Sequence, residues 1–220
     1  MPSFPWRLVT FDIDGTLTLV HGWKYIADRR GLAEQWRRST SRYLRKESTE
    51  NEHLKELLGL GAGLSRRELY AFLSHIPKLR GIGAAVAALH ERGARAALLT
   101  HNPPYVTDWW KRRYGFDDAA GIGNGPELRR GIVPEPGAIR ADKIGGLRRL
   151  SKRWNAPRST IVHVGDGWAD AELFHCVGGS VALNSTLPEV RAAADVALRL
   201  RDLRPLVPEL GRMHPHRAER

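Results

Sequence analysis

The stretch Leu8-Val9-Thr10-Phe11-Asp12-Ile13-Asp14-Gly15-Thr16 carries the clearest structural signal in this sequence. Its first four residues are apolar or β-branched, and the run stops at a carboxylate, which is typical of a strand buried on both faces. Asp14 and Gly15 form a turn signal directly afterwards. The stretch therefore predicts a buried strand with two aspartates at its carboxyl end.

Three further short apolar runs have the same form. They are Ala96–Leu99, Thr160–Val164 and Val181–Leu183, and they end at Thr100, Gly165-Asp166 and Asn184. Helical spacing lies between them, at Ile82, Ala85, Val86 and Leu89 and again at Leu147, Leu150 and Trp154. Asn102 and Pro103 resemble an N-cap and a first helical position. Alternating strands and helices predict an α/β fold with a three-layer, Rossmann-like parallel sheet as its core.

One region breaks this alternation, because residues 21–80 contain no strand candidate. Apolar residues at helical spacing occur there as Leu32, Trp36, Tyr43 and Leu44, and as Leu69, Phe72, Leu73 and Ile76. A glycine-rich link at 59–63 separates the two groups. We predict a helical cap domain at 21–80, a core domain formed by 1–20 and 81–212, and a frayed tail at 213–220.

Composition limits the class of protein. The chain has 220 residues, and its 35 Lys and Arg against 24 Asp and Glu give a formal charge of +11. No apolar run approaches the length of a membrane helix, so no membrane association is expected. The single cysteine, Cys176, excludes an internal disulfide, and the N-terminal stretch lacks a signal peptide. We expect a cytoplasmic protein with an anionic partner, which leaves phosphorylated metabolites and nucleic acid open.

Four polar motifs fall where a parallel sheet binds ligands, outside the carboxyl ends of its strands or beside them. They are Asp12-Ile13-Asp14-Gly15-Thr16, Thr100, Lys143, and Gly165-Asp166-Gly167-Trp168-Ala169-Asp170. Each motif alone has an ordinary structural explanation: a turn, a strand end, a solvated lysine or a charge pair at a helix start. An EF-hand is excluded because Gly15 stands at loop position four rather than six. The ordered set is what indicates a catalytic site.

In these four ordered motifs the chain resembles the haloacid dehalogenase-like phosphohydrolases, and the helical insert is similar to the small cap of their phosphoserine-phosphatase-like branch. The resemblance extends from about Leu8 to Leu206. It implies that Asp12 is the nucleophile, that Asp14 is the general acid and base, and that Thr100 and Lys143 hold the phosphoryl group. It also implies a magnesium site at Asp12, Asp14 and Asp166, with Asp170 supporting the site or orienting Lys143.

Elementary chemistry explains why these residue types are needed. A carboxylate that attacks a phosphomonoester forms an aspartyl-phosphate and divides one difficult step into two. A second carboxyl two residues later projects to the same side of an extended segment, where it can protonate the leaving oxygen. Four aspartates and one lysine leave a formal charge of −3 before a dianionic substrate arrives, and bound Mg²⁺ would offset most of that repulsion.

The chain departs from the branch at several positions. His101 follows Thr100, which makes it a candidate substrate contact, and Ala169 stands where an asparagine is usual. Phosphoserine phosphatases carry an acidic residue where this chain has His21, and their cap arginine has no clear counterpart around residues 54–58. We expect His21 to be a substrate contact or to have a cap-hinge or structural role. We expect Trp168 to pack under the cap, with stacking on the substrate as the less favoured alternative. Strict phosphoserine specificity is therefore doubtful.

The leading hypothesis is a Mg²⁺-dependent phosphatase acting on a small phosphorylated metabolite. Phosphoserine phosphatase proper and a phosphomutase stay open as alternatives. Dehalogenation is disfavoured because that chemistry needs neither Asp14 nor a metal. A nucleic-acid-binding protein or nucleic-acid end-phosphatase is a less favoured alternative, resting on eight Lys or Arg between Gly22 and Lys46. A solvated helix face is the simpler explanation of that charge, and the oligomeric state is unknown from the sequence.

Overall fold

A single six-stranded parallel sheet forms the centre of the computed structural model, which describes residues 4–122 and 127–215. The strands follow the order β3-β2-β1-β4-β5-β6. Their bounds are β1 Leu8–Phe11, β2 Arg95–Leu99, β3 Asp118–Ala120, β4 Ile161–Gly165, β5 Gly179–Leu183 and β6 Val196–Leu198. The chain builds outward from β1 to β3 and then crosses back to β4, so the strand order reverses beside β1. A ligand crevice is expected at that reversal.

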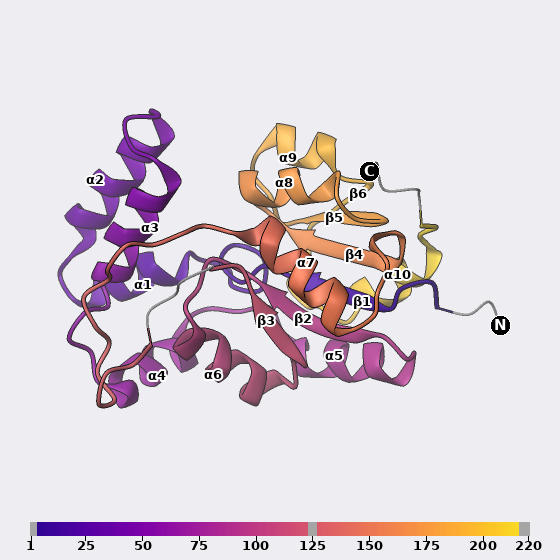
Figure 1. Ribbon diagram of the computed structural model, residues 1–220, viewed down its shortest axis with the longest axis horizontal. Helices are drawn as coiled ribbons and strands as arrows, with labels where there is room; N and C mark the ends of the chain where they lie inside the picture. The colour runs from indigo at the N-terminus through magenta and orange to yellow at the C-terminus, as the bar shows by residue number, and fades with distance from the viewer. Residues whose placement is uncertain (1–3, 123–126, 216–220) are drawn as a thin grey trace.

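Helices cover both faces of the sheet, as Figure 1 shows. One face carries α5 (Ile82–Glu91), α6 (Pro104–Tyr114) and α10 (Leu206–Arg212). The other face carries α7 (Lys143–Arg153), α8 (Trp168–Phe174) and α9 (Pro188–Ala193). The prediction of a three-layer α/β fold is therefore confirmed.

Successive side chains of the central strands point to opposite faces of the sheet, so they contribute to two separate parts of the core. Leu8 packs with Leu147 and Leu150 beneath α7, whereas Val9 joins the larger cluster on the opposite face. All four residues of β1 are buried, as expected of a strand covered on both sides. Thr10 and its register partner His163 on β4 are polar and fully buried, and they occupy the same face as Leu8. Two polar residues at such positions need partners.

Four helices lie between β1 and α5: α1 (Gly22–Arg29), α2 (Ala33–Leu44), α3 (Glu50–Gly59) and α4 (Arg66–His75). Both α3 and α4 begin with a capping box, formed by Thr49 with Glu52 and by Ser65 with Glu68. The segments that enter and leave this region meet at an isolated bridge between Thr18 and Lys78. We call the four helices the cap.

The loop between β3 and α7 also reaches the cap. Val133 exchanges backbone hydrogen bonds with the α3–α4 link, donating to Leu64 O and accepting from Gly63 N at 2.8 and 2.9 Å. Farther along the loop, Ala141 N donates to Asn51 Oδ1 on α3 at 2.7 Å. The cap is therefore tied to the core by this loop as well as by its two connecting segments.

Three local predictions need correction or comment. Helix α6 begins at Pro104 with Pro103 as its N-cap, so Asn102 is not the cap residue. Met213, predicted to belong to a frayed tail, packs partly buried against the core, while residues 216–220 lie outside the described part of the chain. None of the helices described is both long and apolar enough to span a membrane.

Candidate active site

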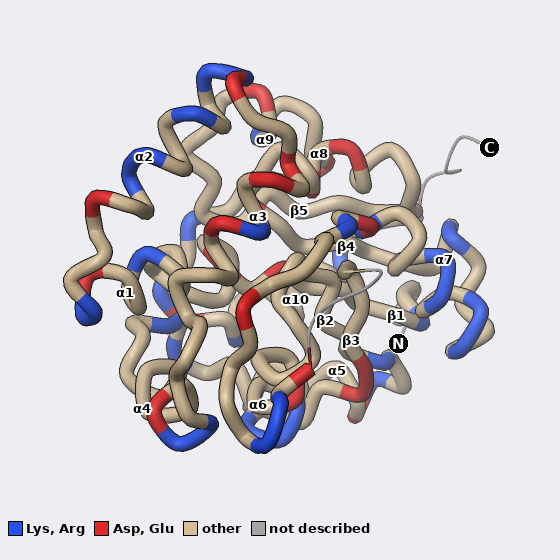
Figure 2. Tube along the Cα trace, turned by 60° about the vertical axis from the view of Figure 1, so that its left-hand side comes forward, with Lys and Arg blue, Asp and Glu red and all other residues tan. Residues whose placement is uncertain are grey.

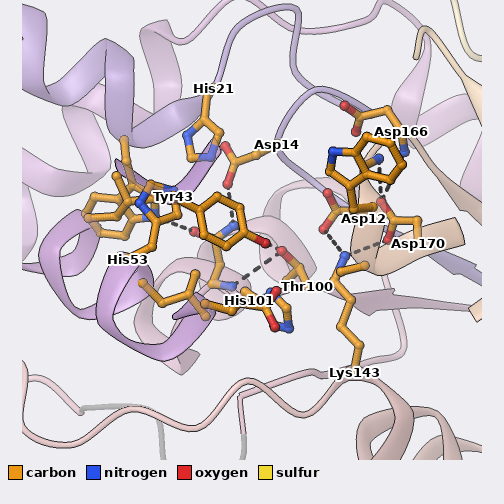
Figure 3. Close-up of a pocket in the computed structure, with 18 of the residues that line it drawn as sticks. Asp12, Asp14, His21, Tyr43, His53, Thr100, His101, Lys143, Asp166 and Asp170 are labelled. Atoms are coloured by element: carbon orange, nitrogen blue, oxygen red, sulfur yellow. Dashed lines mark hydrogen bonds and ion pairs between the residues drawn. The ribbon is translucent and has the colours of Figure 1, made fainter. Parts of the chain in front are cut away.

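A cavity of about 270 Å³ opens at the carboxyl ends of β1, β2 and β4, between the sheet and the cap. Every residue that the sequence singled out lines it (Figure 3): Asp12, Asp14, His21, Thr100, His101, Lys143, Asp166 and Asp170. The first and last of these residues in the chain, Asp12 and Asp170, are 158 positions apart. The parallel sheet brings them together because all of its strands end at the same edge.

Lys143 links two aspartates at the floor of the cavity. Its Nζ lies 3.0 Å from Asp12 Oδ1 and 2.6 Å from Asp170 Oδ1, and all three side chains are almost fully buried. Burial alone would lower the pKa of Lys143, but the two carboxylates raise it well above its ordinary value. For Asp12, burial raises the pKa and Lys143 opposes that effect. The lysine is therefore charged and holds Asp12 in one orientation.

Asp170 has no free carboxylate oxygen. Its Oδ1 accepts a hydrogen bond from Lys143 Nζ and lies 2.9 Å from His163 Nε2. Its Oδ2 accepts the backbone N–H groups of Asp166 and Gly167 at 3.1 and 3.0 Å. Burial would raise the pKa of Asp170, yet Lys143 and His163 hold it far below its ordinary value. Asp170 is thus an anchor for Lys143 and for the loop after β4.

The sequence did not single out His163 as a site residue. Its Nδ1 lies 2.9 Å from Thr10 Oγ1, so the ring is fixed between β1 and Asp170. The imidazole is fully buried. The signal that could have revealed it is a histidine in the middle of a strand that is otherwise apolar, because a buried polar group of that kind must find a partner.

Asp14 lies on the cap side of the cavity, and both its oxygens are engaged. Oδ1 accepts the N–H of Gly22, the first residue of α1, at 2.6 Å, and Oδ2 accepts Asn102 Nδ2 at 2.8 Å. Asn102 Nδ2 also lies 3.1 Å from Thr100 Oγ1, while Asn102 Oδ1 accepts Trp23 Nε1 at 3.2 Å. These contacts occupy the Asn102 side chain, which explains why it does not cap α6. Asn102 is a second site residue that the sequence did not assign.

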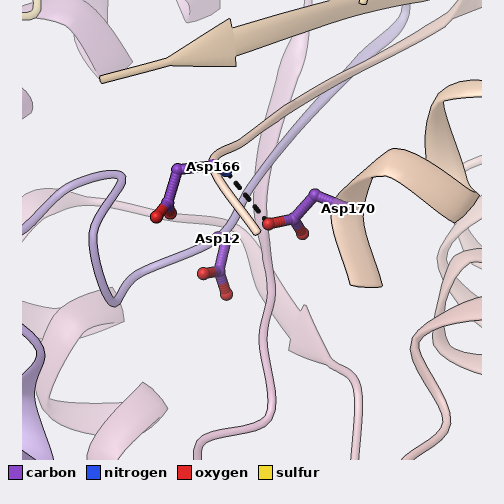
Figure 4. A group of neighbouring side chains, drawn as sticks. All are labelled: Asp12, Asp166 and Asp170. Atoms are coloured by element: carbon purple, nitrogen blue, oxygen red, sulfur yellow. Dashed lines mark hydrogen bonds between the residues drawn. The ribbon is translucent and has the colours of Figure 1, made fainter. Parts of the chain in front are cut away.

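The carboxylates of Asp12, Asp166 and Asp170 approach one another closely, with one oxygen of each within 4.8 Å of the others (Figure 4). Burial, Asp12 and Asp170 raise the pKa of Asp166 well above its ordinary value, although Thr16 Oγ1 donates to Asp166 Oδ1 at 2.6 Å. Like charges this close repel one another, and a bound cation would relieve that repulsion. Asp12 and Asp166 have hard oxygen donors that suit Mg²⁺, whereas the Asp14 side chain lies outside this group of three.

The other candidate residues, His101, His21 and Trp168, also line the cavity. His101 is neutral at pH 7 because burial, followed by Lys143, lowers its pKa to about 3. His21 immediately precedes α1 and faces Trp36 at a ring distance of 6.5 Å. Trp168, expected to pack under the cap, is instead 47% exposed at the cavity mouth. Its exposed part lines the cavity and is accessible to a ligand.

A protein-family model described as haloacid dehalogenase-like hydrolase matches residues 9–175. The chain belongs to this family. The match covers β1 through α8, and it therefore contains all of the motif residues from Asp12 to Asp170. The resemblance seen in the sequence is confirmed at this level.

Curated relatives point to one branch of the family. The chain is 28% identical over 185 residues to a phosphoserine phosphatase of Archaeoglobus fulgidus, covering 81% of this chain and 53% of the relative. It is also 28% identical over 197 residues to a phosphoserine phosphatase of Halobacterium salinarum, covering 86% and 90%. A Mycobacterium tuberculosis phosphoserine phosphatase is matched over 47% of its length. The chain thus spans about half the length of the Archaeoglobus and Mycobacterium relatives.

Solved structures support the fold. A haloacid dehalogenase family hydrolase from Salmonella enterica superposes with a TM-score of 0.83 at 20% identity, covering 93% of this chain and 71% of that one. A phospho-aspartyl intermediate analogue of phosphoserine phosphatase superposes with a TM-score of 0.76 at 21% identity, covering 93% and 98%. The overall fold is therefore shared with hydrolases of this family.

Proposed function

We propose that this chain is a Mg²⁺-dependent phosphomonoester hydrolase that works through an aspartyl-phosphate intermediate on a small phosphorylated metabolite. The observation that carries the proposal is the buried contact of 3.0 Å between Asp12 and Lys143, beside the carboxylate of Asp166, at the floor of the cavity. A buried carboxylate held by a lysine is an oriented nucleophile, and phosphoryl transfer depends mainly on orientation and charge neutralisation. Membership of the hydrolase family supports the same reaction class.

In the first half-reaction, an Asp12 oxygen forms a bond to phosphorus while the bond from phosphorus to the substrate oxygen breaks. Asp14 donates a proton to that departing oxygen. In the second half-reaction, Asp14 takes a proton from water as the water oxygen binds phosphorus and the bond to Asp12 breaks. Asp14 is positioned for this exchange by the Gly22 N–H and by Asn102.

Lys143 and Thr100 hold the phosphoryl oxygens in this proposal. After Thr100, His101 and Asn102 come Pro103 and Pro104, and neither proline has an N–H group. The start of α6 therefore offers fewer donors than an ordinary helix N-terminus. His101 and His21 contact the rest of the substrate. Asp12 and Asp166 hold Mg²⁺, with Asp170 fixing the loop behind them; the bound ion supplies positive charge that offsets the phosphate and the carboxylates.

The relatives' names favour phosphoserine as one candidate substrate. A phosphomutase would share the same first half-reaction and differ in the acceptor. The nucleic-acid alternative has little support from the cavity, because the arginines of α2 do not line it. We expect the protein to be cytoplasmic.

The test is Asp12→Asn, assayed by release of inorganic phosphate from para-nitrophenyl phosphate with and without Mg²⁺. We expect turnover to be abolished, while circular dichroism stays like that of the wild type. Asp28→Asn is the matched control, because Asp28 pairs with Lys24 on the surface of α1 and does not line the cavity. Full activity in Asp12→Asn would rule out the nucleophile.

A further inference from the structure

The cap wall of the cavity carries no lysine or arginine in the part of the chain that the structure describes. Its lining residues are His21, Trp23, Thr40, Tyr43, Leu44, Glu50, His53, Leu54 and Leu57. The core contributes one lysine, Lys143, which already contacts Asp12 and Asp170. A substrate whose leaving group bears a carboxylate would find no lysine or arginine partner on this wall.

The arginines of α2 do not compensate, because none of them lines the cavity, and two of them form ion pairs outside it. Arg37 contacts Glu34 at 2.6 Å and Arg42 contacts Glu56 at 2.8 Å, both on exposed positions of the cap. Figure 2 shows Lys and Arg distributed along the outer side of α2. This charge therefore faces solvent, as the simpler of the two sequence interpretations predicted.

Glu50 brings a negative charge to the same wall. It is the first residue of α3, its side chain is 38% exposed, and its Oε1 lies 3.4 Å from His101 Nδ1. Because the lowered pKa leaves His101 neutral at pH 7, this contact is not an ion pair. Burial raises the pKa of Glu50, which indicates that the carboxylate is incompletely compensated. An ammonium group in the cavity would supply the missing charge.

An aromatic surface lies on the same wall. Tyr43 and His53 stack with ring centroids 4.6 Å apart and an interplanar angle of 4°. Ser39 Oγ fixes the imidazole through a contact of 2.8 Å with His53 Nδ1. Burial lowers the pKa of His53 to about 4, so the ring is neutral at pH 7 and does not repel a cation. Aromatic faces attract ammonium groups within about 6 Å.

We propose, on the basis of the phosphatase function proposed above, that the cavity accepts the phosphate monoester of a small amino alcohol that lacks a carboxylate. The phosphate lies at Asp12, Thr100 and Lys143. The ammonium group lies against Glu50 and the stacked pair of Tyr43 and His53. A substrate of this kind places its positive charge where the wall is negative and requires no arginine.

Three esters that differ in one group test this: O-phosphoethanolamine, O-phosphoserine and 2-hydroxyethyl phosphate. The second adds a carboxylate, and the third replaces the ammonium group with a hydroxyl. We expect kcat/KM for O-phosphoethanolamine to exceed both others by about tenfold or more, the range for a charged hydrogen bond. Equal rates, or preference for O-phosphoserine, would overturn this inference while leaving the hydrolase function intact. Absence of phosphate release from all three and from para-nitrophenyl phosphate would instead refute the hydrolase function.

Glu50→Gln identifies the residue responsible. We expect the ratio of kcat/KM between O-phosphoethanolamine and 2-hydroxyethyl phosphate to fall to about one, because the amide keeps the shape and loses the charge. Glu34→Gln is the matched control, since Glu34 also lies in the first turn of a cap helix but outside the cavity, and its ratio should be that of the wild type. An unchanged ratio in Glu50→Gln would overturn the assignment. The wild-type substrate series decides the main point even if Glu50→Gln folds poorly.

Discussion

Replacing Asp166 with Asn should stabilise the protein in the absence of metal. Asp166 lies within 4.8 Å of Asp12 and Asp170, and Lys143 neutralises only part of that charge. Two unit charges at that distance repel by about 3.5 kcal/mol at an effective dielectric of 20. Asp166 is only partly buried by surface area, so solvent screening reduces this to about 1–2 kcal/mol. The amide oxygen of Asn can still accept the Thr16 hydroxyl.

The assay is thermal unfolding in EDTA and in excess Mg²⁺. For a chain of this size, we expect Asp166→Asn to raise the metal-free Tm by about 2–8 °C. Wild type should gain stability with Mg²⁺, by about 2.7 kcal/mol at 100 times the dissociation constant, and Asp166→Asn should gain little. A lower metal-free Tm in Asp166→Asn, or an equal response of both proteins to Mg²⁺, would refute the reasoning.

The same substitution has a defined dependence on pH. The pKa of Asp166 is raised in the folded protein, so the folded state binds this proton more tightly than the unfolded state, whose aspartates titrate near 3.9. Metal-free wild type therefore loses stability as pH rises from the unfolded value through the raised one. The advantage of Asp166→Asn should be present at high pH and should disappear as pH falls through that window.

Two further variants probe the core beneath the site. His163→Leu keeps a similar volume but removes a donor to Asp170, and we expect kcat for phosphate release to fall about 10–100-fold with KM little changed; unchanged kcat would exclude a positioning role. Gly121→Ala should lower the Tm by about 6 °C or more, since Gly121 has φ of +137° and an added Cβ would lie 2.0 Å from Thr100 O. A Tm within about 2 °C of wild type would contradict that clash.

The central strands could be predicted from the sequence because burial on both faces leaves a continuous apolar run. β1 and β4 have this pattern, and both appear at the predicted places. β3 and β6 are only three residues long and lie half-buried at the two edges of the sheet. β3 begins with an aspartate, and the apolar run of β6 is no longer than Val196-Ala197-Leu198, so neither stands out as a buried strand. Their pairing depends on the neighbouring strand, which local sequence does not reveal.

The motif residues of the site could be predicted for a similar reason. Asp12, Thr100 and Asp166 each directly follow the last residue of a strand. Because parallel strands end at the same edge of the sheet, the three residues lie together. Which of the aspartates hold an ion and which orient other groups could not be predicted. Asp170 is fully occupied by Lys143, His163 and two N–H groups, which leaves Asp12 and Asp166 as the better oxygen donors for an ion. The difference between Asp170 and the other two aspartates depends in part on His163, which is held beside Asp170 by its contact with Thr10. That contact exists because β1 pairs with β4, and the local sequence does not show which strands pair.

Asn102 illustrates the limit of local rules most clearly. Before a proline, an asparagine has the chemistry of a helix N-cap, and those rules consider partners within three residues. Its actual partners include Trp23 and Asp14, which lie 79 and 88 positions away. Because Trp23 belongs to the cap and Asp14 to the core, the Asn102 amide couples the position of the cap to the orientation of the proposed acid. Movement of α1 would therefore alter the hydrogen bonding of Asp14 directly, through the Gly22 N–H as well as through Asn102.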